Sequence, residues 1–178
     1  MRRLAEPSGN LSAMHPAALP DEALLDACRE TRTKRGGPGG QHRNKTETAV
    51  VLVHVPTGIA AEASERRSQH ENRGVALKRL RLRLALEHRS KSKPSVPSAL
   101  WRSRSRGQRL VISVDHGDYP ALVAEALDHL QAAGADASAV AESLGVSTTQ
   151  LVRLFQKSPA AWVAFNKLRA ACGLLPLK

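Results

Sequence analysis

The chain has 178 residues and carries 27 Lys and Arg against 16 Asp and Glu, a formal net charge of +11. This length fits one or two small domains. Hydrophobic residues make up 42% of the sequence, which is enough for a packed core and excludes global disorder. The uninterrupted apolar stretches are short, so the sequence predicts no membrane-spanning helix. Two cysteines provide neither a disulfide framework nor a zinc-ligand cluster and favour a reduced interior, so we expect a cytoplasmic protein.

The positive charge belongs to the first part of the chain. Residues 1–110 hold 22 Lys and Arg and 10 Asp and Glu, a net charge of +12, whereas residues 111–178 hold 5 and 6, a net charge of −1. Such an excess of basic residues is typical of proteins that bind polyanions. All five aromatic residues come after residue 100, so the basic part has no rings on which single-stranded bases could stack. We therefore expect contacts to the phosphates and the shape of structured RNA.

The beginning of the chain predicts a short helix, a loop and a β-hairpin. Residues 1–20 are rich in Pro, Ser and Ala and indicate a disordered terminus, with an organelle transit peptide as the weaker alternative. Residues 21–35 are expected to begin with a helical turn and to continue as an extended segment. Four glycines and one proline in residues 36–41 exclude regular structure there and predict an exposed loop. The β-branched segment 49–55 predicts a buried strand, and residues 59–63 are expected to return as its hairpin partner.

The rest of the chain is expected to be mainly helical. Ser68 and Glu71 have the spacing of a capping box, so a long helix is expected to begin there and to run to about residue 88. Residues 90–106 are rich in Ser, Pro, Lys and Arg and indicate a basic linker, after which a strand is expected at 108–114. The remaining helices are expected at residues 120–133, 137–144, 148–156 and 159–171.

Three blocks of sequence carry the functional signal. They are KRGGPGGQHRNKTET at residues 34–48, HVPTGI at residues 54–59 and RSQHENR at residues 67–73. In this order and at these separations, the blocks resemble the catalytic domain of class I peptide chain release factors over roughly residues 20–90. A lone Gly-Gly-Gln would be common by chance, and a Gly-rich linker or a phosphate-binding loop is the alternative for it. The two later blocks favour the release-factor interpretation.

The resemblance implies an activity. Proteins of this family place the Gly-Gly-Gln loop in the peptidyl transferase centre of the ribosome, where it promotes attack of water on the ester that joins the peptide to transfer RNA. It implies catalytic roles for Gly39, Gly40 and Gln41. Glycines add little bulk in a narrow cavity and reach backbone angles closed to other residues, so the Gln41 N–H is expected to stabilise the oxyanion or the leaving oxygen. The Gln41 amide does not titrate near neutral pH and is expected to shape the pocket, not to act as a base.

The same resemblance implies an RNA-binding surface around the loop and at the start of the long helix, where the positive end of the helix dipole suits a phosphate. The residues expected to bind RNA are Arg35, His42, Arg43, Asn44, Lys45, Arg67, Gln69, Asn72 and Arg73. Arg43 departs from the family, which usually carries a small apolar residue at that position, and Arg35-Gly36 replaces a pair of small polar residues. Both departures leave Gly-Gly-Gln intact, so hydrolysis is still expected.

The length of the chain narrows the expected activity. A release factor that recognises stop codons needs further domains, and nothing before residue 20 offers them. We therefore expect ribosome-dependent hydrolysis of peptidyl-tRNA without codon recognition, as in the short family members that rescue stalled ribosomes. The ribosome and peptidyl-tRNA are the expected partners of a monomer without membrane contact, metal or organic cofactor. The alternatives are a non-catalytic ribosome-binding or RNA-binding factor and a DNA-binding regulator with a helix-turn-helix.

Residues 139–154 resemble a helix-turn-helix, with Gly145 at the turn and Ser147 as the cap of the second helix. The net charge of −1 after residue 110 argues against strong nucleic-acid binding there, so a packing or protein-contact module is favoured. The expected fold is α+β, with a small antiparallel sheet and a long helix followed by a small helical domain. Its expected segments are a disordered terminus (1–20), a catalytic domain (21–90), a basic linker with a strand (91–117) and a helical domain (118–178).

Overall fold

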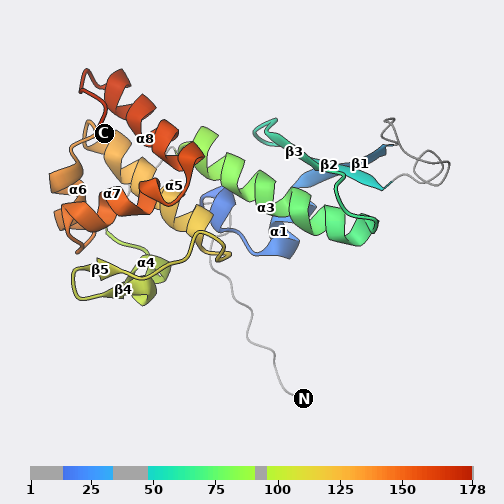
Figure 1. Cartoon of the computed structure of the whole chain (residues 1–178), viewed down its shortest axis with the longest axis horizontal. Coiled ribbons are helices and arrows are strands. Elements are labelled where there is room, and N and C mark those ends of the chain that lie inside the picture. Colours follow the sequence, from blue (N-terminus) through green and yellow to red (C-terminus); the bar gives the residue numbers. More distant parts are fainter. Residues whose placement is uncertain (1–13, 34–47, 91–95, 178) are drawn as a thin grey trace, which may run out of the picture.

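The computed structural model describes residues 14–33, 48–90 and 96–177 (Figure 1). A three-stranded antiparallel sheet and a long helix lie at one end of the fold, and a group of helices lies at the other (Figure 1). The α+β class predicted from the sequence is therefore confirmed. Within the described ranges, no helix combines the length and the apolar character needed to cross a bilayer.

The sheet contains β1 (Cys28–Thr33), β2 (Ala49–His54) and β3 (Ala60–Ala63), in the order β1-β2-β3. Two short helices precede it: η2 (Pro16–Ala18), a 3-10 helix, and α1 (Asp21–Asp26). The long helix α3 (Gln69–Glu87) follows the sheet and packs on one of its faces. The hairpin of β2 and β3 and the helix after it therefore agree with the prediction.

The central strand β2 is buried on one face only. Val50 and Leu52 are fully buried in the core beneath α3, whereas Val51 and Val53 are half-buried on the opposite face. A strand whose alternate residues face a helix and solvent in this way is typical of a sheet covered on one side. The prediction of a buried strand thus holds for the α3 face.

Helix α3 begins and packs as its sequence predicts. The Ser68 hydroxyl accepts a hydrogen bond from the Glu71 backbone N–H at 3.5 Å, which confirms Ser68 as the cap. Ala76, Leu80 and Leu84 are fully buried at a spacing of four residues, the period of a helix face that contacts a core. Along this stretch, Arg79 and Arg83 are exposed, whereas Arg81 is buried.

The segment 14–20 is ordered, although the sequence predicts a disordered terminus up to residue 20. The Arg81 guanidinium donates to the carbonyl oxygens of Ala17 (2.8 Å) and Leu19 (2.5 Å) and to the Asp21 carboxylate (2.5 Å). A charged group that is largely removed from water needs such partners. The buried arginine therefore holds the segment against α3.

The helical part contains α5 (Tyr119–Ala132), α6 (Ala137–Ser143), α7 (Thr148–Gln156) and α8 (Pro159–Ala171). Their bounds lie within one residue of the predicted ones. Helix α5 packs against α3, and the two cores meet there. Ala124 of α5 belongs to the core beneath the sheet, and Leu82 and Leu86 of α3 pack against the helical core.

The described end of the predicted linker is folded. It forms α4 (Ala99–Arg104) and a hairpin of β4 (Ser105–Arg106) and β5 (Arg109–Leu110). The expected strand at 108–114 shrinks to the two residues of β5. Trp101 is fully buried in the helical core, and the burial of this side chain explains why the segment is folded and is not an extended linker.

His15 connects the N-terminal segment to the end of α3. Its Nδ1 accepts the Ala17 backbone N–H at 3.0 Å, so Nδ1 carries no proton, and Nε2 lies 3.2 Å from the His88 carbonyl oxygen as the donor. Burial lowers the pKa of His15 to about 4, against the weaker opposing influence of the His88 carbonyl and Asp128. The folded protein therefore favours the neutral imidazole.

We expect the free energy of unfolding to fall as the pH drops from 6.5 toward about 4, because the unfolded chain then binds a proton that folded His15 does not. The full effect is about 3 kcal/mol, since each pKa unit corresponds to about 1.4 kcal/mol. Urea unfolding at neutral pH and at about pH 4 would measure it in the wild type and in a His15→Gln variant. Equal pH dependence in the two proteins would contradict this assignment.

Candidate functional site

The candidate site begins at the end of the sheet where β1 stops and β2 starts. Thr33 pairs with Ala49 across the two strands, so the ends that flank residues 34–47 are fixed side by side. The predicted catalytic residues and most predicted RNA-binding residues belong to this segment. Those that lie outside the described residues are Arg35, Gly39, Gly40, Gln41, His42, Arg43, Asn44 and Lys45.

Asn72 fastens the start of α3 to the end of that segment. Its Nδ2 donates to the carbonyl oxygens of Thr48 (2.7 Å) and Arg66 (3.0 Å), and its Oδ1 accepts the Arg66 backbone N–H (2.9 Å). The residue is fully buried, so these bonds satisfy an amide that has no access to water. The sequence predicts an RNA contact for Asn72, but the structure uses its amide inside the protein. We therefore treat Asn72 as a residue that positions the site.

Replacing Asn72 by alanine should lower the free energy of unfolding by roughly 1–3 kcal/mol, because backbone groups of Thr48 and Arg66 lose the partner that the buried amide provides. Urea denaturation would measure the change. The matched control is His70→Ala, since His70 is exposed in the same helical turn and should change stability little. An equal loss in both variants would argue against the anchoring role.

The other predicted residues of α3 lie at its N-terminal end. Arg67 and Arg73 are exposed, and Gln69 is half-buried. The Arg73 Nε lies 2.8 Å from one oxygen of Glu30, whose other oxygen lies 3.2 Å from the Arg32 Nε. Burial acts to raise the pKa of Glu30, but hydrogen bonds and charges from the two arginines outweigh it and lower the pKa. Glu30 therefore remains a carboxylate and orients both side chains.

Two further arginines near this end are absent from the sequence prediction. Arg32 is exposed on β1 and pairs in register with Val50, and exposed Arg66 lies beside the Asn72 amide. A signal for Arg32 exists in the sequence, because charged residues are typical of an edge strand such as β1. We call Arg32, Arg66, Arg67 and Arg73 the loop-base surface. Guanidinium groups at such a surface suit phosphate oxygens.

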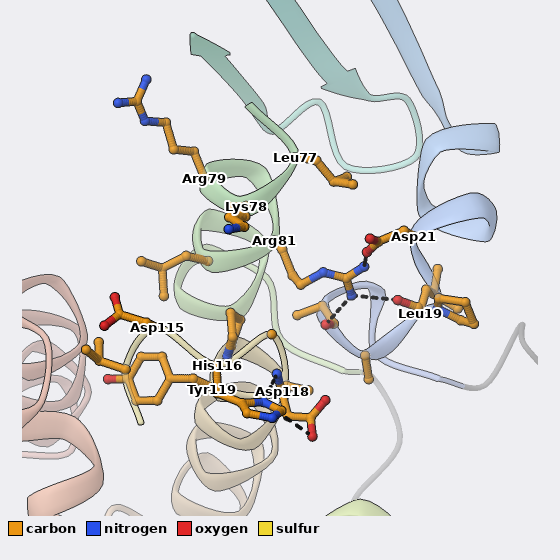
Figure 2. A pocket seen from close by; sticks show the side chains of 18 of the residues that line it. Leu19, Asp21, Leu77, Lys78, Arg79, Arg81, Asp115, His116, Asp118 and Tyr119 are labelled. Atoms are coloured by element: carbon orange, nitrogen blue, oxygen red, sulfur yellow. Dashed lines mark hydrogen bonds and ion pairs between the residues drawn. The ribbon is translucent and has the colours of Figure 1, made fainter. Parts of the chain in front are cut away.

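A cavity of about 710 Å³ lies farther along α3, between that helix, the segment around η2 and the start of α5 (Figure 2). Arg81 points toward Asp21 in its wall, and Asp118 lies beside His116 (Figure 2). The Tyr119 hydroxyl donates to the Leu154 carbonyl oxygen, and burial raises the pKa of Tyr119 to about 12. The loop-base surface is the better candidate site, because it adjoins the ends of the predicted catalytic segment, whereas the cavity lies farther along α3.

Comparison with known proteins finds similarities to the first part of the chain. Residues 25–111 match the family model of the RF-1 domain. Peptide chain release factor 2 of Petrotoga mobilis is 47% identical over 73 residues, which are 40% of this chain and 19% of that protein. Peptide chain release factor 2 of Variovorax paradoxus is 59% identical over 51 residues, 29% of this chain and 14% of that protein.

Peptide chain release factor 1 of Dictyoglomus thermophilum is 34% identical over 114 residues, 60% of this chain and 31% of that protein. The matched part thus covers between 14% and 31% of the length of these relatives. The family match extends from the end of α1 to the β4–β5 hairpin and includes the Gly-Gly-Gln segment. Residues 25–111 of this chain are therefore similar to the RF-1 domain family.

Proposed function

We propose that the chain hydrolyses the ester bond of peptidyl-tRNA on the ribosome. The observation that carries this proposal is Gly39-Gly40-Gln41, which lies with its flanking blocks inside the matched range 25–111. The paired ends of β1 and β2 and the bond from Asn72 to Thr48 support the proposal, because they hold both ends of the catalytic segment on a rigid element.

In the proposed reaction, water adds to the ester carbonyl carbon, the bond to the ribose oxygen of the tRNA breaks, and that oxygen takes up a proton. Donors aimed at the developing negative charge are worth most in a site that excludes water. The backbone N–H of Gln41 is the proposed donor, and ribosomal RNA supplies much of the surrounding pocket. Arg35, His42, Arg43, Asn44 and Lys45, with the loop-base surface, would bind the phosphates that orient the segment.

We further propose that release needs no stop codon and that the chain acts on stalled ribosomes. This part of the proposal carries forward the expectation that the chain resembles the short family members that rescue stalled ribosomes. The described elements outside residues 25–111 are η2, most of α1 and the helices α5 to α8, which pack on α3 and on one another.

The test is release of formyl-methionine from initiator tRNA on ribosomes with a sense codon in the decoding site. Truncated messages and long messages would be compared, each with and without a stop codon. Release that is independent of the stop codon is the expected result, and greater release on truncated messages would support action on stalled ribosomes. Strict dependence on a stop codon would overturn the codon-independent part of the proposal.

Arg43 favours a second candidate function, that of a ribosome-binding factor without hydrolysis, because it adds a charge where release factors usually carry a small apolar residue. The same assay separates the two candidates. Ribosome binding without release in the wild type, together with release in an Arg43→Val variant, would support the second candidate.

A further inference from the structure

The helices α6 and α7 form a helix-turn-helix. Gly145 has a φ of +67° in the turn between them, a backbone conformation that favours glycine. The Ser147 hydroxyl accepts the Gln150 backbone N–H at 3.3 Å and caps α7. Leu151, Leu154 and Phe155 are buried and face the core, so Thr149 and Arg153 lie on the outer face of α7. This second helix is the one that enters a groove in nucleic-acid-binding proteins of this type.

The β4–β5 hairpin is fixed beside this helix-turn-helix, although the two are far apart in the sequence (Figure 1). Both the turn and the first residues of α7 are bonded to it. Ser147 N donates to Gln108 O (3.0 Å), and Leu110 N donates to Gln150 Oε1 (3.4 Å). Trp101 of α4, which directly precedes the hairpin, donates its Nε1–H to Leu144 O (3.0 Å). The hairpin and α7 therefore form one continuous surface.

The hairpin brings basic side chains to the helical part. Residues 97–113 and 144–157 together hold six Lys and Arg and no Asp or Glu. Arg104 is paired with Asp118, whereas the others are exposed. These exposed residues are Arg102, Arg106, Arg109, Arg153 and Lys157. The near-neutral charge after residue 110 thus gives an incomplete account of this part of the molecule, because its surface includes arginines from before that residue.

Two of these arginines lie directly opposite each other. Arg106 pairs with Arg109 across the hairpin, on either side of a turn in which Gly107 has a φ of +55°. Like charges at directly opposed positions destabilise a hairpin. Both side chains are exposed, and neither forms an ion pair with a described residue. The hairpin therefore holds two positive charges next to each other without a carboxylate partner among the described residues, which suits an anionic ligand.

The surface suits a double helix better than a single strand. Single-strand binders stack bases on exposed aromatic rings. Trp101, Tyr119, Phe155 and Phe165 are buried, and Trp162 is half-buried against Phe165 on α8, at a ring-centroid distance of 5.5 Å. Arginines beside a helix-turn-helix, without exposed rings, instead match the phosphates that flank the groove of a duplex.

We propose that α7 and the β4–β5 hairpin bind double-helical nucleic acid through its phosphates, independently of the Gly-Gly-Gln segment. The chemistry is shared by duplex RNA and duplex DNA, so the test includes both. Arg106 and Arg109 would contact one strand beside the groove, and Arg153 would contact the backbone from the outer face of α7. This surface is separate from the loop-base surface, which lies at the other end of α3.

The test uses the full chain and fluorescence anisotropy with a labelled RNA duplex, the DNA duplex of the same sequence and one unpaired strand, over a range of salt concentrations. The test variant combines Arg106→Gln, Arg109→Gln and Arg153→Gln. The matched control removes three exposed positive charges elsewhere, with Arg29→Gln, Lys78→Gln and Lys167→Gln.

We expect the slope of log K against log salt to fall by about 2 to 3 in the test variant, because each lost phosphate contact contributes about 0.9. The control should keep the wild-type slope, and lysine at the three tested positions should retain most of it. Stronger binding of one of the two duplexes would show whether the surface prefers RNA or DNA. An unchanged slope in the test variant, an equal loss in the control, or equal binding of the single strand would overturn the proposal. Peptide release is not the readout, so failure here is distinct from failure of the proposed hydrolysis.

Discussion

Replacing Gly40 by alanine is expected to lower peptide release by about 10²–10³-fold while ribosome binding is retained. In the proposed mechanism, the added β-carbon brings bulk to the catalytic segment and restricts the backbone angles that aim the Gln41 N–H. Loss of one donor to an oxyanion has this magnitude in known hydrolases. The loop-base surface is unchanged in this variant, so phosphate binding there should persist. Single-turnover release of formyl-methionine at saturating protein, with co-sedimentation on ribosomes, would measure both properties.

The matched control is Gly74→Ala. Gly74 lies in α3, and a β-carbon built at this position meets no neighbouring atom within 4 Å. Alanine favours a helix over glycine by about 1 kcal/mol, so this variant should be slightly more stable and fully active. Full release by the Gly40→Ala variant would refute the proposed mechanism. If the Gly40→Ala variant lost both ribosome binding and peptide release, the substitution would act on docking.

Local signals account for the elements that the sequence predicts well. Helices α7 and α8 have the predicted bounds because each start is marked within a few residues. Ser147 caps α7 through the Gln150 N–H, and Pro159 occupies the first position of α8, where a missing N–H is tolerated. The Ser68 cap of α3 is of the same kind. None of these starts depends on a distant part of the chain.

Long-range partners account for the elements that the sequence does not predict. The order of residues 14–20 depends on Arg81, which is more than 60 residues away in sequence from the carbonyl groups it binds. The folding of the predicted linker depends on the contact between Trp101 and Leu144, which are 43 positions apart. A composition rich in Ser, Pro and Arg gives no sign of either partner. Such bonds become visible only when α3 is placed beside η2 and α4 beside the end of α6.

The candidate site shows the same division. The Gly-Gly-Gln segment is visible in the sequence because its residue types are specific and contiguous. The role of Asn72 cannot be predicted from the sequence, because its partner Thr48 lies 24 residues earlier and accepts only through its backbone carbonyl. Within a block that resembles an RNA-binding sequence, an amide side chain suggests an external contact, and only its burial assigns it to the interior.

The Trp101→Ala variant is expected to lose about 3–5 kcal/mol of unfolding free energy, the usual cost of deleting a buried aromatic side chain. Trp101 is fully buried among the helices, and its indole N–H satisfies the Leu144 carbonyl at the turn of the helix-turn-helix. The substitution removes the packing that holds α4 and the bond that joins α4 to the turn between α6 and α7. Urea unfolding followed by circular dichroism would measure the loss.

The Trp101→Phe variant separates the two contributions. It keeps most of the apolar volume but leaves the Leu144 carbonyl without its donor, so a loss of roughly 1–3 kcal/mol is expected. The control is Trp162→Phe, since Trp162 is half-buried and stacks on Phe165 without an indole bond to a described residue. It should cost less than Trp101→Phe. If the two conservative variants are equally stable, the indole bond adds no stability to the contact between α4 and the helix-turn-helix. If Trp101→Ala also retains wild-type stability, α4 does not belong to the helical core. Salt-dependent duplex binding by a folded Trp101→Phe variant would then show whether Arg106 and Arg109 keep their orientation when only the hairpin bonds of Gln108 and Leu110 remain.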